Sequence, residues 1–121
     1  MNDKNYVLID EKSTFIDERV KIGENVIIYE NNRIDGCSEI CDNVTIYPNS
    51  FIVNSIIGKG SKIYSSYIEN CRIGARNIIN PFSTIKKVVS ETDVVVSSCS
   101  EVKNIRLKRS KRKTVSDTFS T

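Results

Sequence analysis

Isoleucine recurs every six residues through the middle of this chain. In the stretch IDGCSEICDNVTIYPNSFI, residues 34–52, isoleucine occupies the first, seventh, thirteenth and last positions. A spacing of six differs from the 3.6-residue period of a buried helix face. Because six is a multiple of two, each hexapeptide can instead form a short strand with alternate side chains inward, followed by a bend.

The repeat extends in both directions from this stretch. A strict step of six is followed by a mixture of fives and sixes and then by two further sixes: Ile16, Ile22, Ile28, Ile34, Ile40, Ile46, Ile52, Ile57, Ile63, Ile68, Ile73, Ile79 and Ile85. Four residues after most of them lies a small or aliphatic residue: Val20, Val26, Ser38, Val44, Ser50, Ser61, Ser83 and Val89. Self-similarity at a short fixed period is typical of a solenoid.

Three strands and three bends would close one triangular coil of about 18 residues, and successive coils would stack about 4.8 Å apart with parallel strand pairing. Glycine and asparagine are frequent between the isoleucines, and both tolerate the left-handed backbone conformation that tight bends require. We therefore expect an all-β parallel β-helix of roughly five coils from residue 16 to about residue 102, with isoleucine along its axis.

Charge divides the chain into an acidic body and a basic end. Residues 1–102 carry a net charge of −3, and residues 103–121 carry a net charge of +6. We expect an N-terminal cap over residues 1–12, the β-helix over residues 13–102 and an irregular, flexible basic tail over residues 103–121. In the cap, Tyr6, Val7, Leu8 and Ile9 are expected to face the axis, because an open β-helix end exposes unpaired strand edges.

The cysteines and the hydropathy limit the classes of site. With no histidine in the chain, a zinc site would need all four cysteines, and the sequence contains no CxxC pair, so we expect free thiols and no metal: Cys37, Cys41, Cys71 and Cys99. Cys37 and Cys71 are expected in one column but two coils apart, too far for a disulfide. No apolar run is long enough to span a membrane and no signal peptide is visible, which favours a cytoplasmic protein.

Stacking sorts the outward residues that follow each isoleucine into three columns, one for each face. The first column contains Tyr29, Tyr47, Tyr64 and Asn80; the second contains Gly23, Cys41, Gly58 and Gly74; the third contains Asp17, Asp35, Val53 and Glu69. A ladder of exposed tyrosines is either ordinary stacking of like side chains or a subunit interface, because aromatic rings bring large contact areas. The acidic column is expected to face solvent.

The hexapeptide pattern resembles that of the hexapeptide-repeat acyltransferases, whose parallel β-helix is left-handed. Three segments are similar to the first coils of the acetyltransferase domain of the bifunctional bacterial enzyme that makes UDP-N-acetylglucosamine: STFIDERVKIGENVIIYENNRIDG, NSFIVNSIIGKGSKIYSSYIENCRIG and NPFSTIK. The irregular steps of five between Ile52 and Ile73 carry this resemblance most specifically. The resemblance implies a left-handed coil and a homotrimer assembled through prism faces.

The resemblance also implies where a catalytic site would lie. Lys86 and Lys103 match positions that contact the sugar phosphate, whereas Val115 falls where the base histidine belongs and Thr118 falls where a substrate-binding tyrosine belongs. An amine acceptor needs a general base with a suitable pKa, and this chain has no histidine. The coils that hold acetyl-CoA and the uridyltransferase half are expected to be missing, so we assign no cofactor and no catalytic residue.

Three hypotheses about function follow. The first is a non-catalytic trimeric scaffold or accessory subunit, which could work beside a catalytic subunit of the same family. The second is a residual acyltransferase for an amino sugar phosphate, using a base other than histidine. The third is an adaptor that binds an anionic polymer through KNIRLKRSKRK, in which seven of eleven residues are basic.

Overall fold

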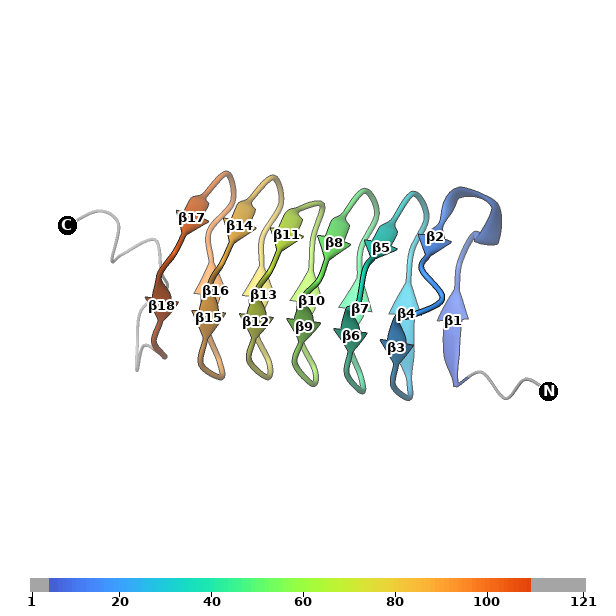
Figure 1. Ribbon diagram of the computed structural model, residues 1–121, viewed down its shortest axis with the longest axis horizontal. Coiled ribbons are helices and arrows are strands. Elements are labelled where there is room, and N and C mark those ends of the chain that lie inside the picture. The colour runs from blue at the N-terminus through green and yellow to red at the C-terminus, as the bar shows by residue number, and fades with distance from the viewer. Residues whose placement is uncertain (1–4, 110–121) are drawn as a thin grey trace.

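The strands wind into a straight three-sided column, which the computed structural model describes over residues 5–109 (Figure 1). The first two coils consist of β1 (Tyr6–Leu8), β2 (Phe15–Ile16), β3 (Lys21–Ile22), β4 (Val26–Ile28), β5 (Arg33–Asp35) and β6 (Glu39–Ile40). The third and fourth consist of β7 (Thr45–Ile46), β8 (Phe51–Val53), β9 (Ile56–Ile57), β10 (Lys62–Ile63), β11 (Tyr67–Glu69) and β12 (Arg72–Ile73). The last two consist of β13 (Ile78–Ile79), β14 (Thr84–Lys86), β15 (Val89–Ser90), β16 (Val95–Val96), β17 (Glu101–Lys103) and β18 (Arg106–Leu107).

Every third strand belongs to the same parallel sheet, so the column has three six-stranded faces. Sheet A has the order β1-β4-β7-β10-β13-β16, sheet B the order β2-β5-β8-β11-β14-β17, and sheet C the order β3-β6-β9-β12-β15-β18. A single turn of 3₁₀-helix, η1 (Glu11–Ser13), interrupts the first coil between β1 and β2. The all-β, left-handed parallel β-helix expected from the sequence is confirmed.

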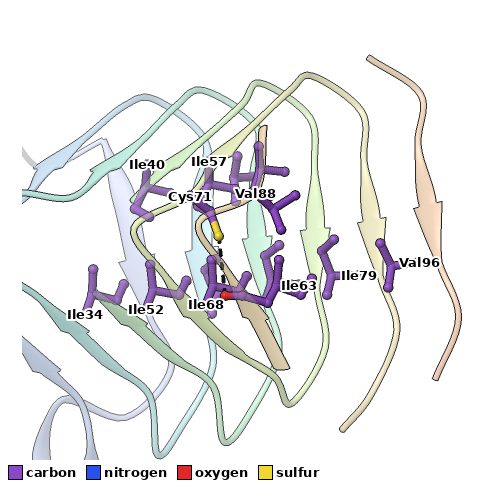
Figure 2. Packing of buried hydrophobic residues seen from close by; sticks show 14 of the residues in the cluster. Ile34, Ile40, Ile52, Ile57, Ile63, Ile68, Cys71, Ile79, Val88 and Val96 are labelled. Carbon is purple, nitrogen blue, oxygen red and sulfur yellow. Dashed lines mark hydrogen bonds between the residues drawn. The ribbon is translucent and has the colours of Figure 1, made fainter. Parts of the chain in front are cut away.

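The isoleucine rows fill the axis of the column. Register pairs each inner isoleucine with the one in the next coil, as in Ile28 with Ile46 and Ile46 with Ile63. Eleven of the thirteen predicted isoleucines are at most 2 % exposed, and Figure 2 shows several of them projecting into one continuous interior. Full burial of one such side chain contributes about 1.5–3 kcal/mol, so the repeated row is the main stabilising feature of the stack.

Polar side chains inside the corners continue the backbone ladder between coils. Ser38 Oγ accepts the amide N–H of Ser55, and Ser55 Oγ in turn accepts the amide N–H of Cys71. Asn32 likewise accepts the amide N–H of Ser50 and donates to the carbonyls of Tyr29 and Ile46. Within the described residues no buried side-chain nitrogen or oxygen lacks a hydrogen-bond partner, so these groups hold the coils in register without an energetic penalty.

The bends use the left-handed backbone conformation that the sequence predicts. From β3 onwards, positive φ angles occur at a single position in each corner, and asparagine or glycine occupies nine of these positions: Asn25, Asn31, Gly36, Asn43, Asn49, Asn54, Gly60, Asn70 and Asn104. Gly58 and Gly74 have a different role. A Cβ atom on Gly58 would lie 2.4 Å from the carbonyl carbon of Gly74, so these glycines let consecutive coils approach closely.

The column has about six coils, where the sequence predicted roughly five. The first strand was missed because Leu8 takes the position of an inner isoleucine, in register with Ile28. The last strand, β18, lies beyond the predicted end at residue 102 and was missed because its inner residue is Leu107. The expected boundaries at residues 12 and 102 stay a prediction, although strands run from Tyr6 to Leu107, and residues 110–121 of the expected tail lie outside the described part.

Two side-chain directions differ from expectation at the N-terminal end. Tyr6 and Leu8 pack against the core as predicted. Val7 and Ile9 are about half exposed, because strand alternation turns them to the outer face.

Steps of five residues, in place of six, change which side chains point inward at two further places. The step from Ile85 to the next inner residue, Ser90, is five, so Val88 is buried and Val89 points outward. The five-residue step from Ile52 to Ile57 likewise aligns Cys71 with Ser55 and Ser38, whereas Cys37 contacts Asn54 instead.

Replacing one isoleucine in the middle of a row should destabilise the whole column. We expect Ile46→Ala to lower the free energy of unfolding by about 2–5 kcal/mol, because its site is closed by coils on both sides and leaves a cavity. Ile105→Ala, at an isoleucine outside the axial rows that is 46 % exposed, is the matched control and should cost less than about half as much. Denaturant unfolding measures both, and equal losses would contradict the axial core.

Candidate functional site

The two lysines expected to contact a sugar phosphate lie side by side on sheet B. Lys86 ends β14 and Lys103 ends β17, and the two residues are direct partners in the parallel register. Both side chains point outward, away from the apolar axis. The fold therefore brings together two ammonium groups that are 17 positions apart in the chain.

The two lysine side chains make different contacts with their neighbours. The Lys86 ammonium lies 5.5 Å from the centre of the Tyr67 ring, a cation–π contact. The Lys103 ammonium lies 3.0 Å from a Glu101 carboxylate oxygen. Tyr67 donates a hydrogen bond of 2.7 Å to Glu69, and this bond raises the pKa of the tyrosine hydroxyl. The two ammonium groups present positive charge to an anion, and they lie on the outer surface of sheet B.

The remaining expected positions do not complete a catalytic centre within the described chain. Val115 and Thr118 lie outside the described residues, and their expected placement stays a prediction. The carboxylate of Glu101, which is on the same strand as Lys103, is engaged by the Lys103 ammonium. Residues 5–109 contain no group of three or more histidine, cysteine, aspartate or glutamate side chains arranged to hold a metal.

All four cysteines are free thiols, as the sequence indicated. Cys37 is exposed and Cys71 is buried, and both lie at corners between sheets B and C. Burial raises the pKa of the Cys71 thiol, whose sulfur also lies 3.3 Å from the carbonyl of Ile85 (Figure 2). A buried thiol of raised pKa behaves as a small packing residue.

The three tyrosines form a stacked ladder on the outer face of sheet A. The ring centres of Tyr29 and Tyr47 are 5.2 Å apart, and those of Tyr47 and Tyr64 are 4.2 Å apart with nearly parallel planes. A hydrogen bond with the Tyr64 side chain, together with burial, raises the pKa of the Tyr47 hydroxyl. Asn80 continues the column and donates its side-chain amide to the carbonyl of Val96.

A second outward column on sheet A extends this apolar surface. It runs in register through Val7, Ile27, Thr45, Lys62, Ile78 and Val95. We define these six residues, together with Ile9, Tyr29, Tyr47, Tyr64, Asn80 and Ser97, as the sheet A face. Lys62 is its one charged residue. This column consists of the residue before each inner aliphatic residue, so sorting only the residue that follows each isoleucine does not reveal it.

Sheets B and C present much more charge on their outer sides. On sheet B, Arg33 packs over the rings of Phe15 and Phe51 and also forms an ion pair of 2.8 Å with Asp35. On sheet C, the outward positions include Lys21, Glu39, Arg72 and Arg106. Sheet A is therefore the apolar side of the column.

Known proteins resemble part of this chain in sequence. The bifunctional protein GlmU of Clostridium beijerinckii is 42 % identical over 79 residues, which cover 65 % of this chain and 17 % of that protein. GlmU of Clostridium botulinum strain Eklund 17B is 43 % identical over 79 residues, and GlmU of Synechococcus elongatus is 38 % identical over 79 residues. The repeat region is a partial relative of GlmU.

This relationship has a limited extent. The chain spans less than a fifth of the length of the GlmU proteins that it matches. No family model matches the chain. The resemblance to GlmU that the hexapeptide segments predicted is confirmed for this part.

Two solved structures align with most of this chain. PerB from Caulobacter crescentus, in complex with CoA and GDP-perosamine, aligns with a TM-score of 0.46 and 18 % identity over 88 % of this chain and 53 % of that chain. The H141N mutant of perosamine N-acetyltransferase from the same organism aligns with a TM-score of 0.48 and 15 % identity over 84 % of this chain and 54 % of that chain.

The tyrosine ladder on sheet A makes a titration prediction. In Tyr64→Phe, the pKa of Tyr47 should fall towards its ordinary value of about 10, because the hydrogen bond that favours the neutral hydroxyl is removed. Site-resolved NMR of ¹³Cζ-labelled tyrosine measures this shift. Tyr67→Phe on sheet B is the control and should leave Tyr47 unchanged; an unchanged Tyr47 in Tyr64→Phe would contradict the ladder.

Proposed function

We propose that this chain is a non-catalytic, trimeric scaffold or accessory subunit related to the sugar N-acetyltransferases, assembled through the sheet A face. The observation that carries the proposal is the composition of that face: twelve outward positions with a single charge, at Lys62. Val7, Ile9 and Ile27 on it are 54 %, 51 % and 36 % exposed. A contiguous apolar surface of this kind marks an interaction site.

The aromatic ladder gives this face the qualities of an interface core. Tyrosine brings a large contact area at low conformational cost, and its hydroxyl tolerates residual water. The three rings are already stacked within one chain, so association would order few additional side chains. The resemblance to trimeric hexapeptide-repeat enzymes supports a three-fold assembly.

The chemistry of the chain supports a non-catalytic role. No histidine occurs anywhere in the 121 residues, and the carboxylate beside the lysine pair is engaged in an ion pair. We place the trimer in the bacterial cytoplasm, beside a catalytic subunit of the same family. No helix in the described part of the chain is long and apolar enough to cross a membrane.

A charge introduced into the ladder should dissociate the assembly. We expect Tyr47→Arg to reduce the mass measured by analytical ultracentrifugation from three copies to one, because each interface would then bury unpaired guanidinium groups. The measurement is made in high salt, so that contacts between surface charges are screened.

Tyr67→Arg provides the matched control, since it makes the same change at a half-buried tyrosine on sheet B. It should leave the mass at three copies. A wild-type chain that is monomeric at all concentrations, or a Tyr47→Arg chain that keeps its mass, would overturn the trimer.

The lysine pair supports a second role within the same proposal: binding an amino sugar phosphate without acetylating it. We expect glucosamine 1-phosphate to shift NMR signals near Lys86 and Lys103, and Lys86→Ala to weaken binding by about fivefold or more through loss of a charged phosphate contact. Lys59→Ala, an exposed lysine elsewhere, should have no effect.

The same sample tests catalysis directly. With acetyl-CoA added, no acetylated sugar should form. Turnover that disappears in Lys103→Ala would support the residual acyltransferase instead and would reject the non-catalytic role.

A further inference from the structure

Within residues 5–109, the N-terminal end of the column is open. Its mouth is a hollow of about 510 Å³ with an apolar floor that includes Leu8, Ile16 and Ile22 and an acidic rim formed by Glu11, Asp17 and Glu18. Ile16 and Ile22 belong to the same axial rows as the fully buried isoleucines, yet both are only half-buried. The mouth is therefore core surface that the first coil leaves exposed.

Unpaired strand edges surround this hollow. Among residues 5–109, no strand pairs with the outer edges of β1, β2 and β3, which end the three sheets. The other end of the column differs, because the inner side chains of its last coil, Val96, Val102 and Leu107, are buried. Free edges beside an apolar floor form a template for an extended segment from another chain.

The charges of the two ends are opposite. The lining of the mouth contains three carboxylates and no lysine or arginine. Asp17 is held by Arg19 through a contact of 2.8 Å, whereas Glu11 and Glu18 are exposed. At the far end of the column (Figure 1), the last coil exposes four basic residues in sequence order: Lys103, Arg106, Lys108 and Arg109. Two of them have acidic neighbours in the same chain, since Lys103 lies 3.0 Å from Glu101 and Arg109 lies 3.9 Å from Asp93.

We propose that the mouth is a docking site for the basic segment 108–113 (KRSKRK) of a second copy of this chain. Five of its six residues are Lys or Arg, which matches the acidic rim. The aliphatic stems of these side chains can cover the apolar floor while their charged ends meet Glu11 and Glu18.

The segment cannot reach the mouth of its own chain. Six coils place the two ends about 24 Å apart, at about 4.8 Å for each of the five steps. Lys113 lies four residues beyond Arg109, and four residues span at most about 14 Å. Residues 110–121 lie outside the described part, and this limit depends on chain length alone.

The contact joins different surfaces of the two copies. Each copy offers one mouth and one basic segment, so the association is heterologous and continues head to tail along the column axis. It is independent of the proposed sheet A trimer, because it uses the ends of the column and depends on charge. Salt should weaken it steeply, whereas an apolar face-to-face contact should persist.

Charge reversal tests the proposal on the full chain. Variant one reverses the mouth, Glu11→Lys with Glu18→Lys; variant two reverses the segment, Lys111→Glu, Arg112→Glu and Lys113→Glu. At low salt, sedimentation should show wild-type association above the mass found in high salt, and each variant alone should lose it by more than about tenfold in association constant. An equimolar mixture of the two should regain it, because each mouth then finds a segment of opposite charge.

The control reverses two acidic residues away from the mouth, Glu30→Lys with Glu39→Lys, and should associate like the wild type. A zero-length carbodiimide cross-linker applied to mixed light and ¹⁵N-labelled chains should join Glu11 or Glu18 of one copy to Lys111 or Lys113 of another. The proposal is overturned if salt does not change the mass, if the mixture does not regain association, or if only the mouth variant has an effect, which would indicate mouth-to-mouth contact.

Discussion

The whole structure depends on burying one branched aliphatic side chain per strand between neighbouring coils. A two- or three-residue strand such as β7 has no stability by itself, because its backbone groups pair only with the strands above and below it. The same stacking that satisfies the backbone also closes the interior over Ile46. Backbone pairing and apolar burial are thus one cooperative interaction, and every added coil covers the one before it.

This arrangement separates the surface into three independent faces. Since the inner rows hold the fold, the outward columns are free to differ, and they do. Sheet A gathers Tyr29, Tyr47 and Tyr64 with little charge, whereas sheet B places Lys86 beside Lys103. The proposed assembly and the proposed anion site therefore lie on different sides of the column and need not compete, and the proposed end-to-end contact uses neither side.

Sequence reasoning succeeded wherever a residue repeats and failed wherever the repeat changes its residue or its length. The isoleucine rows, the left-handed bends at asparagine and the tyrosine ladder all follow from a fixed period. The strands β1 and β18 were missed because leucine, at Leu8 and Leu107, replaces isoleucine in the first and last coils. Val89 continues the sequence pattern of an aliphatic residue four positions after an isoleucine, yet it points outward, because the five-residue step after Ile85 makes Ser90 the next inner residue.

By itself the sequence determined the coil, since a hexapeptide period leaves one way to bury its branched side chains, and it also indicated the partial relationship to GlmU. Tertiary structure decided what each outward residue does. Whether Ile27 joins Tyr47 on one apolar face, or Lys86 meets Lys103, depends on turn lengths summed over a whole coil. The exposure of the mouth beside Ile16 also depends on the tertiary structure. Its apolar floor is exposed because, among the described residues, no strand stacks beyond the first coil.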